Sequence, residues 1–457
     1  MNTGRLILLV LVLSIFSSVV PEEAPILVVE VFRHGARGPE MTQFDQEKYW
    51  GVNAGQLTPG GQRMHYLLGV ALKEQYPSLL EKYNPEKIYA RSTDVNRTIM
   101  SVYAHLYGIF EANGPALADG VVKEEAIPPF KSEIIQKTVE TLDNAHALPN
   151  SIQPVPIHVT TEANDNVLRP WSACPQANTW YNDGMVDRES RSVFDTDMKD
   201  TVKSFNDKNI KVNNVMELYA LADLSITNKF QGIPLPGKIT LDSQEFKDLN
   251  FFAEWVTIKS VDLFEDQISL YALGLLNNIY DFLNGRANGT NALDFVFLSG
   301  HDTSLLNLLI PFGITNKTCF RENYKNIKAK KEVPFPECQF PTYASNLIFE
   351  LYEKPEPYLV FKYNGKPLQF CGKDKNKCTL PEFASFIKKA TKSYTQSDFQ
   401  EKCALNTDQR NYLWLIILFV VCFGLGIGLL AIRKDLKQKE KELSVQPTQG
   451  GEYYLGK

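Results

Sequence analysis

The stretch ILVVEVFRHGARGPE, residues 26–40, changes character abruptly near its middle. Its first part, residues 26–32, is a nearly continuous apolar run, which is typical of a buried β-strand. Two arginines and a histidine, Arg33, His34 and Arg37, follow at once. In open α/β sheets, ligands bind beyond the carboxyl ends of the strands. The stretch therefore predicts a site for an anionic ligand at the end of a buried strand.

Strand-like runs alternate with helical patterns along the rest of the chain. The candidate strands are residues 26–33, 87–91, 156–160, 294–299, 346–352 and 358–363. The candidate helices are residues 59–75, 94–111, 249–283 (with a break) and 303–310. This alternation predicts an α/β fold, a three-layer sandwich around a mostly parallel sheet. Residues 130–288 carry few strand signals, and we expect them to form a helical cap region inserted into the fold.

The two ends of the chain carry apolar segments of different length. Residues 1–20 have a basic residue followed by a short apolar run, as in a secretory signal peptide. Residues 412–432 contain no charged side chain and form a stretch long enough to cross a bilayer as a helix. Basic residues follow at once, which places the tail, residues 433–457, in the cytoplasm. The sequence thus predicts a single-pass type I membrane protein whose main domain, residues 21–411, is lumenal or extracellular.

Composition and cysteine usage agree with that location. The net charge of −5 disfavours a nucleic-acid partner, because such proteins are normally basic. An even number of cysteines in an oxidising compartment favours three disulfides, and the cysteines of the main domain are Cys174, Cys319, Cys338, Cys371, Cys378 and Cys403. Metal binding is the alternative, but no CxxC or HxxxH pattern supports it. Glycosylation sequons at Asn96, Asn288 and Asn316 fit the same compartment.

Two further motifs stand at the ends of predicted strands. Arg91 ends the strand at residues 87–91, and His301 and Asp302 follow the strand at residues 294–299. Arginine side chains match pairs of phosphate oxygens, and a neutral imidazole can attack phosphorus. Arginines beside a histidine also disfavour its protonated form. A carboxyl group such as that of Asp302 can protonate a leaving alcohol, so the three motifs together indicate phosphoryl transfer.

The remaining histidines carry no motif. His65 and His105 lie within helical patterns, and we interpret them as structural or surface residues. His146 and His158 are equally uninformative.

Several longer stretches identify the chain as similar to the histidine acid phosphatases, the RHGxRxP branch of the phosphoglycerate-mutase-like superfamily. Residues 55–69 (GQLTPGGQRMHYLLG), 90–101 (ARSTDVNRTIMS), 297–305 (FLSGHDTSL) and 341–352 (PTYASNLIFELY) resemble the lysosomal and prostatic acid phosphatase group most closely. The resemblance covers nearly the whole main domain. The signal peptide, the single apolar segment and the short tail resemble the lysosomal form.

The resemblance implies a role for each residue of the three motifs. His34 would be the nucleophile and form a phosphohistidine, and Asp302 would protonate the leaving alcohol. The phosphate-binding residues would be Arg33, Arg37, Arg91 and His301. No metal or other cofactor is implied, and the substrates would be small phosphate monoesters. Turnover should rise as the pH falls to about 5, where the acid is more often protonated.

The resemblance also implies a covalent framework. Cys174 would pair with Cys403 and Cys371 with Cys378, which leaves Cys319 for Cys338. It further implies that a homodimer can form.

Two features depart from the family pattern. Asn96 stands where relatives usually have aspartate, which creates a sequon close to Arg91, and a glycan there could obstruct the site. The tail sequence GGEYYLGK lacks the usual tyrosine sorting signal, so a lysosomal or other vesicular compartment and the cell surface all stay open.

Three alternatives to an acid phosphatase remain. A phytase or inositol-polyphosphate phosphatase would use the same motifs but needs a strongly cationic pocket, and the cap region shows no concentrated Lys/Arg run. A mutase would use glutamate as its acid and work in the cytosol. A non-catalytic surface receptor on the same fold would be expected to have lost His34 or Asp302, and both are present.

Overall fold

The computed structural model describes residues 24–45, 47–118, 123–129, 132–142, 146–264, 266–353, 356–371, 377–404 and 407–443. The chain divides into two compact units, Met1–Gln400 and Glu401–Lys457. The predicted signal peptide, residues 1–20, lies outside the described residues, as does the end of the predicted tail, residues 444–457.

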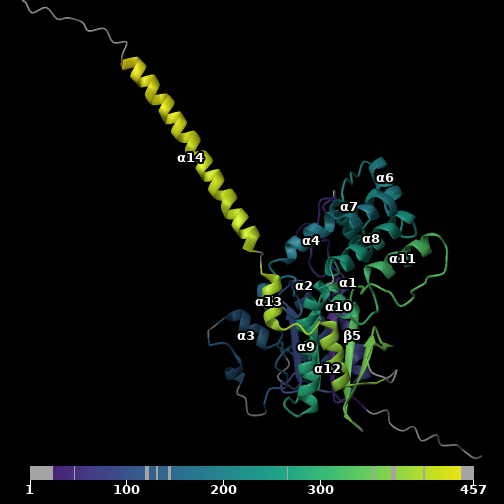
Figure 1. Ribbon diagram of the computed structural model, residues 1–457. Helices are drawn as coiled ribbons and strands as arrows, with labels where there is room; N and C mark the ends of the chain where they lie inside the picture. Colours follow the sequence, from purple (N-terminus) through teal and green to yellow (C-terminus); the bar gives the residue numbers. More distant parts are fainter. Residues whose placement is uncertain are drawn as a thin grey trace, which may run out of the picture. The chain divides into compact units, whose positions relative to one another are not determined.

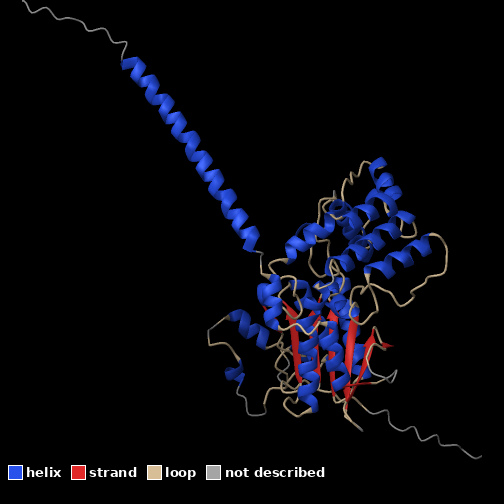
Figure 2. Ribbon diagram, viewed as in Figure 1, coloured by secondary structure: helices blue, strands red, loops and turns tan. Residues whose placement is uncertain are grey.

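A mixed β-sheet forms the centre of the first unit (Figures 1 and 2). Its strands are β1 (Leu27–Arg33), β2 (Ile88–Thr93), β3 (His158–Thr160), β4 (Phe295–Gly300), β5 (Asn346–Tyr352), β6 (Tyr358–Tyr363), β7 (Lys366–Leu368) and β8 (Cys378–Thr379). They lie in the order β3-β2-β4-β1-β5-β6-β7, with β8 also paired to β6. All six predicted strands are therefore present, and β7 and β8 are additional.

The prediction of a mostly parallel sheet is wrong for half of the sheet. Strands β3, β2, β4 and β1 run parallel, whereas β5, β6, β7 and β8 pair antiparallel. The physical reason is visible between β6 and β7. Asn364 and Gly365 both adopt positive φ, 48° and 76°, which is the backbone of a two-residue hairpin turn. Short turns join antiparallel strands, whereas a parallel pair needs a longer crossover.

Helices cover both faces of the sheet, as the sandwich prediction requires. Helices α1 (Pro59–Gln75) and α2 (Asn96–Ile109) pack on the face that receives Val28 and Phe32 of β1. Helices α9 (Gln267–Ala287), α10 (Asp302–Leu309) and α12 (Leu380–Ala390) pack on the face that receives Val29 and Val31. Helix α1 begins where the sequence predicts, because the Thr58 side chain accepts a hydrogen bond from the Gly61 backbone N–H and proline fills the first helical position.

A second hydrophobic core lies in the helical region beyond one end of the strands (Figure 1). Its helices are α4 (Ala177–Val186), α5 (Arg188–Ser192), α6 (Lys199–Asp207), α7 (Val215–Gln231), α8 (Gln244–Val261) and α11 (Lys317–Lys328). The predicted cap, residues 130–288, includes elements that do not belong to this second core. We call the helices around the second core the cap. Strand β3 joins the sheet and α9 packs against it, because the apolar face of α9 matches the sheet face of β1.

The remaining described elements are short or belong to the second unit. Helix α3 spans Glu133–Val139, and single helical turns cover Gly51–Asn53, Lys123–Ala126, Pro149–Ser151, Glu162–Asn164, Val193–Asp197 and Pro236–Lys238. Helices α13 (Gln396–Cys403) and α14 (Thr407–Leu443) end the described chain.

Among the described residues, no helix combines the length and apolar character needed to cross a membrane, so the predicted span at residues 412–432 lacks support here. The side chains of residues 407–417, which include the start of that span, lie outside the described part.

Two of the three predicted disulfides are confirmed. Cys319 bonds to Cys338 and Cys371 bonds to Cys378, with Cα–Cα distances of 6.3 and 5.4 Å. The third pair, Cys174 with Cys403, joins residues of the two units and stays a prediction.

The close packing of α1 on α2 depends on two glycines that face the opposite helix. A Cβ atom on Gly69 would lie 2.1 Å from the carbonyl oxygen of His105, and one on Gly108 would lie 2.2 Å from that of Tyr66. The helix backbones therefore approach more closely than any side chain would allow.

We expect Gly69→Ala to lower the free energy of unfolding by about 1–3 kcal/mol, because the added methyl group overpacks this contact. Gly60→Ala, on the same helix, is the matched control. Its Cβ would meet nothing closer than 3.4 Å, so it should leave stability unchanged or slightly raised. Urea unfolding of the two variants measures the difference, and equal midpoints would contradict the assignment.

Candidate active site

The ends of three neighbouring strands meet at one edge of the sheet. His34 follows β1, His301 follows β4, and Thr93 ends β2, and these strands are adjacent in the order β2-β4-β1. Beyond them lies a cavity of about 560 Å³ whose walls include His34, Arg37, His301 and Asp302. The predicted convergence of the strand-end motifs is therefore present in the structure for these residues.

The hydrogen bonds of His34 define which ring nitrogen carries its proton. Nδ1 lies 2.8 Å from the carbonyl oxygen of Gly35, which can only accept, so Nδ1 is the donor. A neutral ring then has its lone pair on Nε2. The Nε of Arg97 donates to that atom across 3.2 Å. His34 thus presents an unprotonated Nε2 beside a guanidinium group, which is the form a nucleophile toward phosphorus requires.

Burial and charge both keep the two site histidines neutral. Burial lowers the pKa of His34 well below its usual range, and Arg97, Arg33, His301 and Arg37 lower it further. The pKa of His301 is lowered in the same way, first by burial and then by Arg97 and other arginines. Nε2 of His301 lies 3.1 Å from the hydroxyl of Thr93 at the end of β2.

Arg33 is held rigidly and is paired with Asp302. One Nη atom donates to the carbonyl oxygen of Pro341 at 2.8 Å, and the other lies 2.8 Å from a carboxylate oxygen of Asp302. The guanidinium also stacks over the ring of Tyr343 at 4.3 Å. Asp302 is the first residue of α10, and its other oxygen accepts from the Thr303 backbone N–H at 2.8 Å. The predicted acid and one predicted phosphate ligand therefore touch each other.

Arg37 is oriented by a carboxylate of the cap. Its two Nη atoms lie 3.0 and 3.2 Å from the two oxygens of Asp223, which belongs to α7. The same carboxylate accepts from the backbone N–H of Glu40 at 2.8 Å. This bidentate pair ties the loop after β1 to the cap and fixes the direction of the Arg37 side chain.

The prediction that Arg91 contributes to the site is not supported by its position. Strand β2 runs to Thr93, two residues further than predicted, so Arg91 lies within the strand rather than at its end. Its guanidinium pairs with Asp165 at 2.6 Å and does not line the cavity.

Arg97, which was not among the predicted site residues, lines the cavity beside His34, where Arg91 was expected. It lies in the first turn of α2, directly after β2, and besides contacting His34 it pairs with Glu40 at 2.8 Å. Arg37 and Arg97 in turn lower the pKa of Glu40, with Arg37 the larger cause. The stretch ARSTDVNRT contains two arginines, and only the true end of the strand distinguishes them.

The cap contributes an uncharged wall to the cavity. Its cavity-lining residues from α4, α7 and α8 are Ala177, Asn178, Tyr181, Met185, Met216, Tyr219, Val256, Thr257, Ser260 and Val261. Tyr271 of α9, which packs on the sheet, adds to the same wall. Burial raises the pKa of Tyr181 to about 12, so this hydroxyl stays neutral. The charged residues that line the cavity come instead from the strand-end loops, from α2 and α10, and from Arg169.

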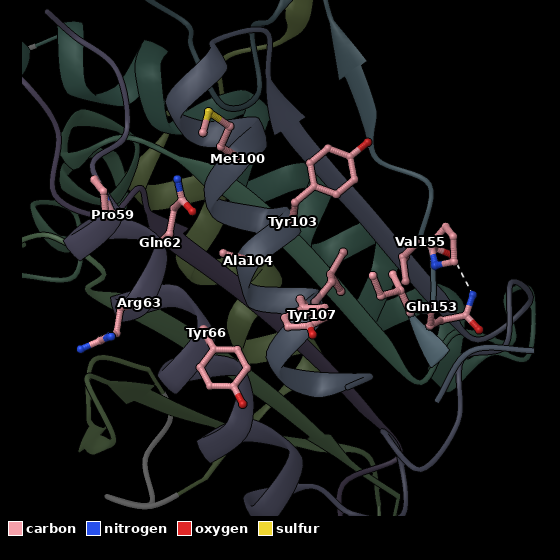
Figure 3. Close-up of a pocket in the computed structure, with 13 residues that line it drawn as sticks. Pro59, Gln62, Arg63, Tyr66, Met100, Tyr103, Ala104, Tyr107, Gln153 and Val155 are labelled. Atoms are coloured by element: carbon pink, nitrogen blue, oxygen red, sulfur yellow. Dashed lines mark hydrogen bonds between the residues drawn. The ribbon is translucent and has the colours of Figure 1, made fainter. Parts of the chain in front are cut away.

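A larger groove, of about 800 Å³, lies elsewhere and has a different character (Figure 3). It runs between α1, α2 and residues 152–155, and its walls carry Tyr66, Met100, Tyr103 and Tyr107. None of the predicted site residues lines it. The predicted site residues lie instead at the strand ends, where His34, Arg37, His301 and Asp302 line the 560 Å³ cavity, and Arg33 lines a smaller one of about 190 Å³ together with Arg37 and Asp302.

The predicted glycosylation sites differ in their surroundings. Asn288 is exposed at the end of α9, and Asn316 is partly buried as the N-cap of α11. Asn96 is exposed at the start of α2, next to Arg97, whereas Thr98 of the same sequon is fully buried. Glycosylation at all three positions stays a prediction. As for metals, no three His, Cys, Asp or Glu side chains of the described residues gather in a way that could hold an ion.

Solved structures with the same fold include two phytases. The phytase from D. castellii matches with a TM-score of 0.54 and 14% identity, covering 84% of this chain and 82% of the phytase. The phytase from Citrobacter braakii matches with a TM-score of 0.54 and 16% identity, covering 84% of this chain and all of the phytase (100%). At these identities the matches show the fold alone.

Curated sequences give a likeness along most of the chain. Lysosomal acid phosphatase of Xenopus laevis is 26% identical over 427 residues, which cover 89% of this chain and 83% of that protein. Putative acid phosphatase 5 of Caenorhabditis elegans is 26% identical over 461 residues, which cover 95% and 94% of the two chains. Prostatic acid phosphatase of Bos taurus is 23% identical and covers 83% of this chain and 87% of its own length. The family model of the histidine phosphatase superfamily (branch 2) matches residues 26–364. The chain belongs to the histidine phosphatase superfamily, branch 2, and at the level of the family the prediction of a phosphatase is confirmed.

Proposed function

We propose that the protein is an acid phosphatase that hydrolyses phosphate monoesters through a phosphohistidine at His34. The observation that carries this proposal is the state of the His34 ring, whose unprotonated Nε2 meets the Arg97 guanidinium at 3.2 Å inside the cavity. Arginines around a neutral imidazole attract a phosphate dianion and stabilise the charge that spreads over its oxygens during transfer.

The reaction has two steps with Asp302 in opposite roles. In the first, Nε2 of His34 forms a bond to phosphorus as the bond from phosphorus to the ester oxygen breaks, and protonated Asp302 gives its proton to that oxygen. In the second, water attacks the phosphohistidine, Asp302 takes a proton from the water, and inorganic phosphate leaves. Arg37, Arg97 and His301 line the cavity beside His34 and would hold the phosphate oxygens, with Arg33 held against Asp302.

Polyphosphate substrates are the main enzymatic alternative, since the solved neighbours named above are phytases. A second phosphate on the substrate would need cations beyond those that hold the first. The uncharged wall of the cavity offers Met216, Tyr219 and Tyr271 instead, and each arginine of the cavity already has a carboxylate partner in Asp223, Glu40 or Glu162. These contacts favour an ester with one phosphate and an uncharged leaving group.

Location and anchoring belong to the same proposal. The relatives named lysosomal acid phosphatase support a lysosomal or other vesicular compartment. Residues 412–432 carry no charged side chain and precede several lysines, which supports a single-pass anchor with the catalytic domain on the lumenal or extracellular side. Alkaline extraction of membranes from expressing cells tests the anchor, because an integral protein stays with the bilayer and a peripheral one is released.

His34→Ala should abolish phosphate release from phenyl phosphate at pH 5, and excess chelator should leave the wild type unaffected. Stopping the wild-type reaction in alkali should trap one phosphoryl group on the protein, which intact mass spectrometry detects. Asp302→Asn should lower kcat for an alkyl phosphate by about 10²–10⁴-fold and for a nitrophenyl phosphate far less, because the better leaving group needs no proton. Phosphorylation of the His34→Ala protein would contradict the nucleophile assignment.

Arg97→Gln should lower kcat/KM for phenyl phosphate by about 10²-fold, because one charged donor to the transferring phosphate is lost. It should also move the acid limb of the pH profile upward. Arg97 is one cause of the lowered His34 pKa, so without it His34 takes up a proton at a higher pH and loses its lone pair there.

Arg91→Lys is the matched control, since it keeps its charge beside Asp165 and lies outside the cavity. Its kcat/KM should stay within about two-fold of the wild type. A loss at Arg91→Lys with none at Arg97→Gln would restore the assignment made from the sequence.

The ratio of kcat/KM for phenyl phosphate to that for inositol hexakisphosphate should exceed about 10, because the described cap residues that line the 560 Å³ cavity carry no cation to meet further phosphates. The same initial-rate assay of inorganic phosphate serves both substrates. A preference for the inositol compound would favour the phytase alternative.

A further inference from the structure

A row of buried polar side chains runs beneath the active site on the α1 and α2 face of the sheet. It contains Glu30 from the middle of β1, His105 from α2, His65 from α1 and Asn346 from β5. Glu30, His65 and His105 have no exposed surface, and apolar residues surround them. Burying ionisable groups of this kind costs free energy unless each one is hydrogen-bonded, so the contacts within the row indicate their protonation states.

The direction of each hydrogen bond in this row follows from its first member. Nε2 of His65 lies 3.0 Å from the carbonyl oxygen of Arg33, which can only accept, so Nε2 carries the proton. A neutral His65 then accepts at Nδ1, and Nδ1 of His105, 3.4 Å away, must be the donor. Burial lowers the pKa of His65 to about 4 and that of His105 well below its usual range, so both rings are neutral.

The last contact needs a proton from Glu30. A neutral His105 that donates at Nδ1 has a lone pair on Nε2, which faces Oε2 of Glu30 at 3.4 Å. Neither of these two atoms has another hydrogen-bond partner among the described residues. The other oxygen of Glu30 accepts from Asn346 at 2.7 Å, as the carbonyl oxygen of a carboxylic acid would. Two lone pairs facing each other would repel, whereas a proton on Oε2 satisfies both atoms.

The far end of the row is the peptide bond that carries the nucleophile. The carbonyl of Arg33 and the backbone N–H of His34 belong to the same peptide unit. The carbonyl receives His65, and the N–H donates to the carbonyl oxygen of Gly300 on β4 at 3.0 Å. The row of polar side chains therefore holds the carbonyl group of the peptide unit that precedes His34, and β4 holds the N–H group of the same unit.

We infer that Glu30, His105 and His65 form a one-directional hydrogen-bond chain that positions His34, and that Glu30 supplies its first proton as a neutral carboxylic acid. These three are positioning residues, since they act through the Arg33–His34 peptide and do not line the cavity. The inference rests on the proposed role of His34 for its catalytic part. Its proton assignment stands on the contacts of the chain alone.

The surroundings of Glu30 favour the neutral form. Phe297 of β4 and Ile348 of β5 are its neighbours in the sheet. Other ionisable groups on this side of the sheet have partners of their own, since the hydroxyl of Tyr76 and the amine of Lys362 both donate to the carboxylate of Glu350. Burial raises the pKa of Glu30 from 4.5 to about 8, against a lowering by the Asn346 hydrogen bond.

The raised pKa of Glu30 makes the free energy of unfolding depend on pH. The unfolded chain loses the Glu30 proton near pH 4.5, whereas the folded chain keeps it to about pH 8. The folded state therefore binds more protons in this window, and the contribution of Glu30 to stability falls as the pH rises from 4.5 to 8. The neutral form of Glu30 is therefore favoured at acidic pH.

The test compares Glu30→Gln with Glu30→Leu in the full-length enzyme. Glutamine can donate to His105 and accept from Asn346 without titrating, so kcat should stay within about two-fold of the wild type. Leucine lacks the donor, and kcat should fall about 10-fold while KM stays nearly unchanged, because geometry is lost and phosphate ligands are kept. The Tm of Glu30→Gln relative to wild type should rise by about 5 °C between pH 5 and pH 8.

Glu350→Gln is the matched control, a buried carboxyl on the neighbouring strand that bonds to Tyr76 and Lys362 instead of the chain. It should show neither the kcat loss of Glu30→Leu nor the rising Tm difference. A kcat loss for Glu30→Gln as large as that for Glu30→Leu would overturn the neutral donor, and so would a Tm difference that does not change with pH. If the wild type proved inactive, the proposed function would fail, and the Tm series would still decide the state of Glu30.

Discussion

The backbone at the end of β1 is the constraint on which the rest of the site depends. Arg33 N–H donates to Ser345 O on the side of β5, and His34 N–H donates to Gly300 O at the end of β4. The carbonyl of Arg33 receives His65 from α1, and the Gly35 N–H donates to the Ser101 hydroxyl on α2. The helices on one face of the central strand and both of its neighbouring strands thus hold the residues around His34. In the proposed reaction, an imidazole fixed in this way would need little reorganisation before it attacks.

The electrostatics of the site follow from placing many cations in a buried volume. Arg37 and Arg97 would repel each other and any protonated histidine, and Asp223 and Glu40 offset that repulsion through ion pairs at 3.0 and 2.8 Å. The same arginines keep His34 neutral, because a charged ring among them would be unfavourable in addition to the cost of burial. The same group of charges therefore keeps His34 unprotonated and, in the proposed reaction, would bind the phosphate.

The cap completes the site from a separate core. Asp223 on α7 forms an ion pair with Arg37, and tyrosine, methionine and valine side chains of the cap helices line a wall of the cavity. The division separates two tasks. In the proposed reaction, the strand ends and the first turns of α2 and α10 would bind and transfer the phosphoryl group, and the cap helices would contact the group esterified to it. Variation of the cap would then alter the choice of leaving group and leave the chemistry in place.

The sequence by itself determined the strand at residues 26–33 and the helix start at Thr58–Pro59, and it predicted four residues, His34, Arg37, His301 and Asp302, that line one cavity in the structure. These depend on local patterns, namely an apolar run that stops at cations, a capping residue before a proline, and short motifs after strands. Only the tertiary structure decided between Arg91 and Arg97, because the choice depends on where β2 ends against β4. It also brought His65 and His105, which the sequence left as structural or surface residues, into one row with Glu30, since residues of β1, α1 and α2 meet only when the helices pack on the sheet. The pair between Arg37 and Asp223 and the antiparallel half of the sheet have the same origin, because contacts between distant residues leave no periodic trace in the chain.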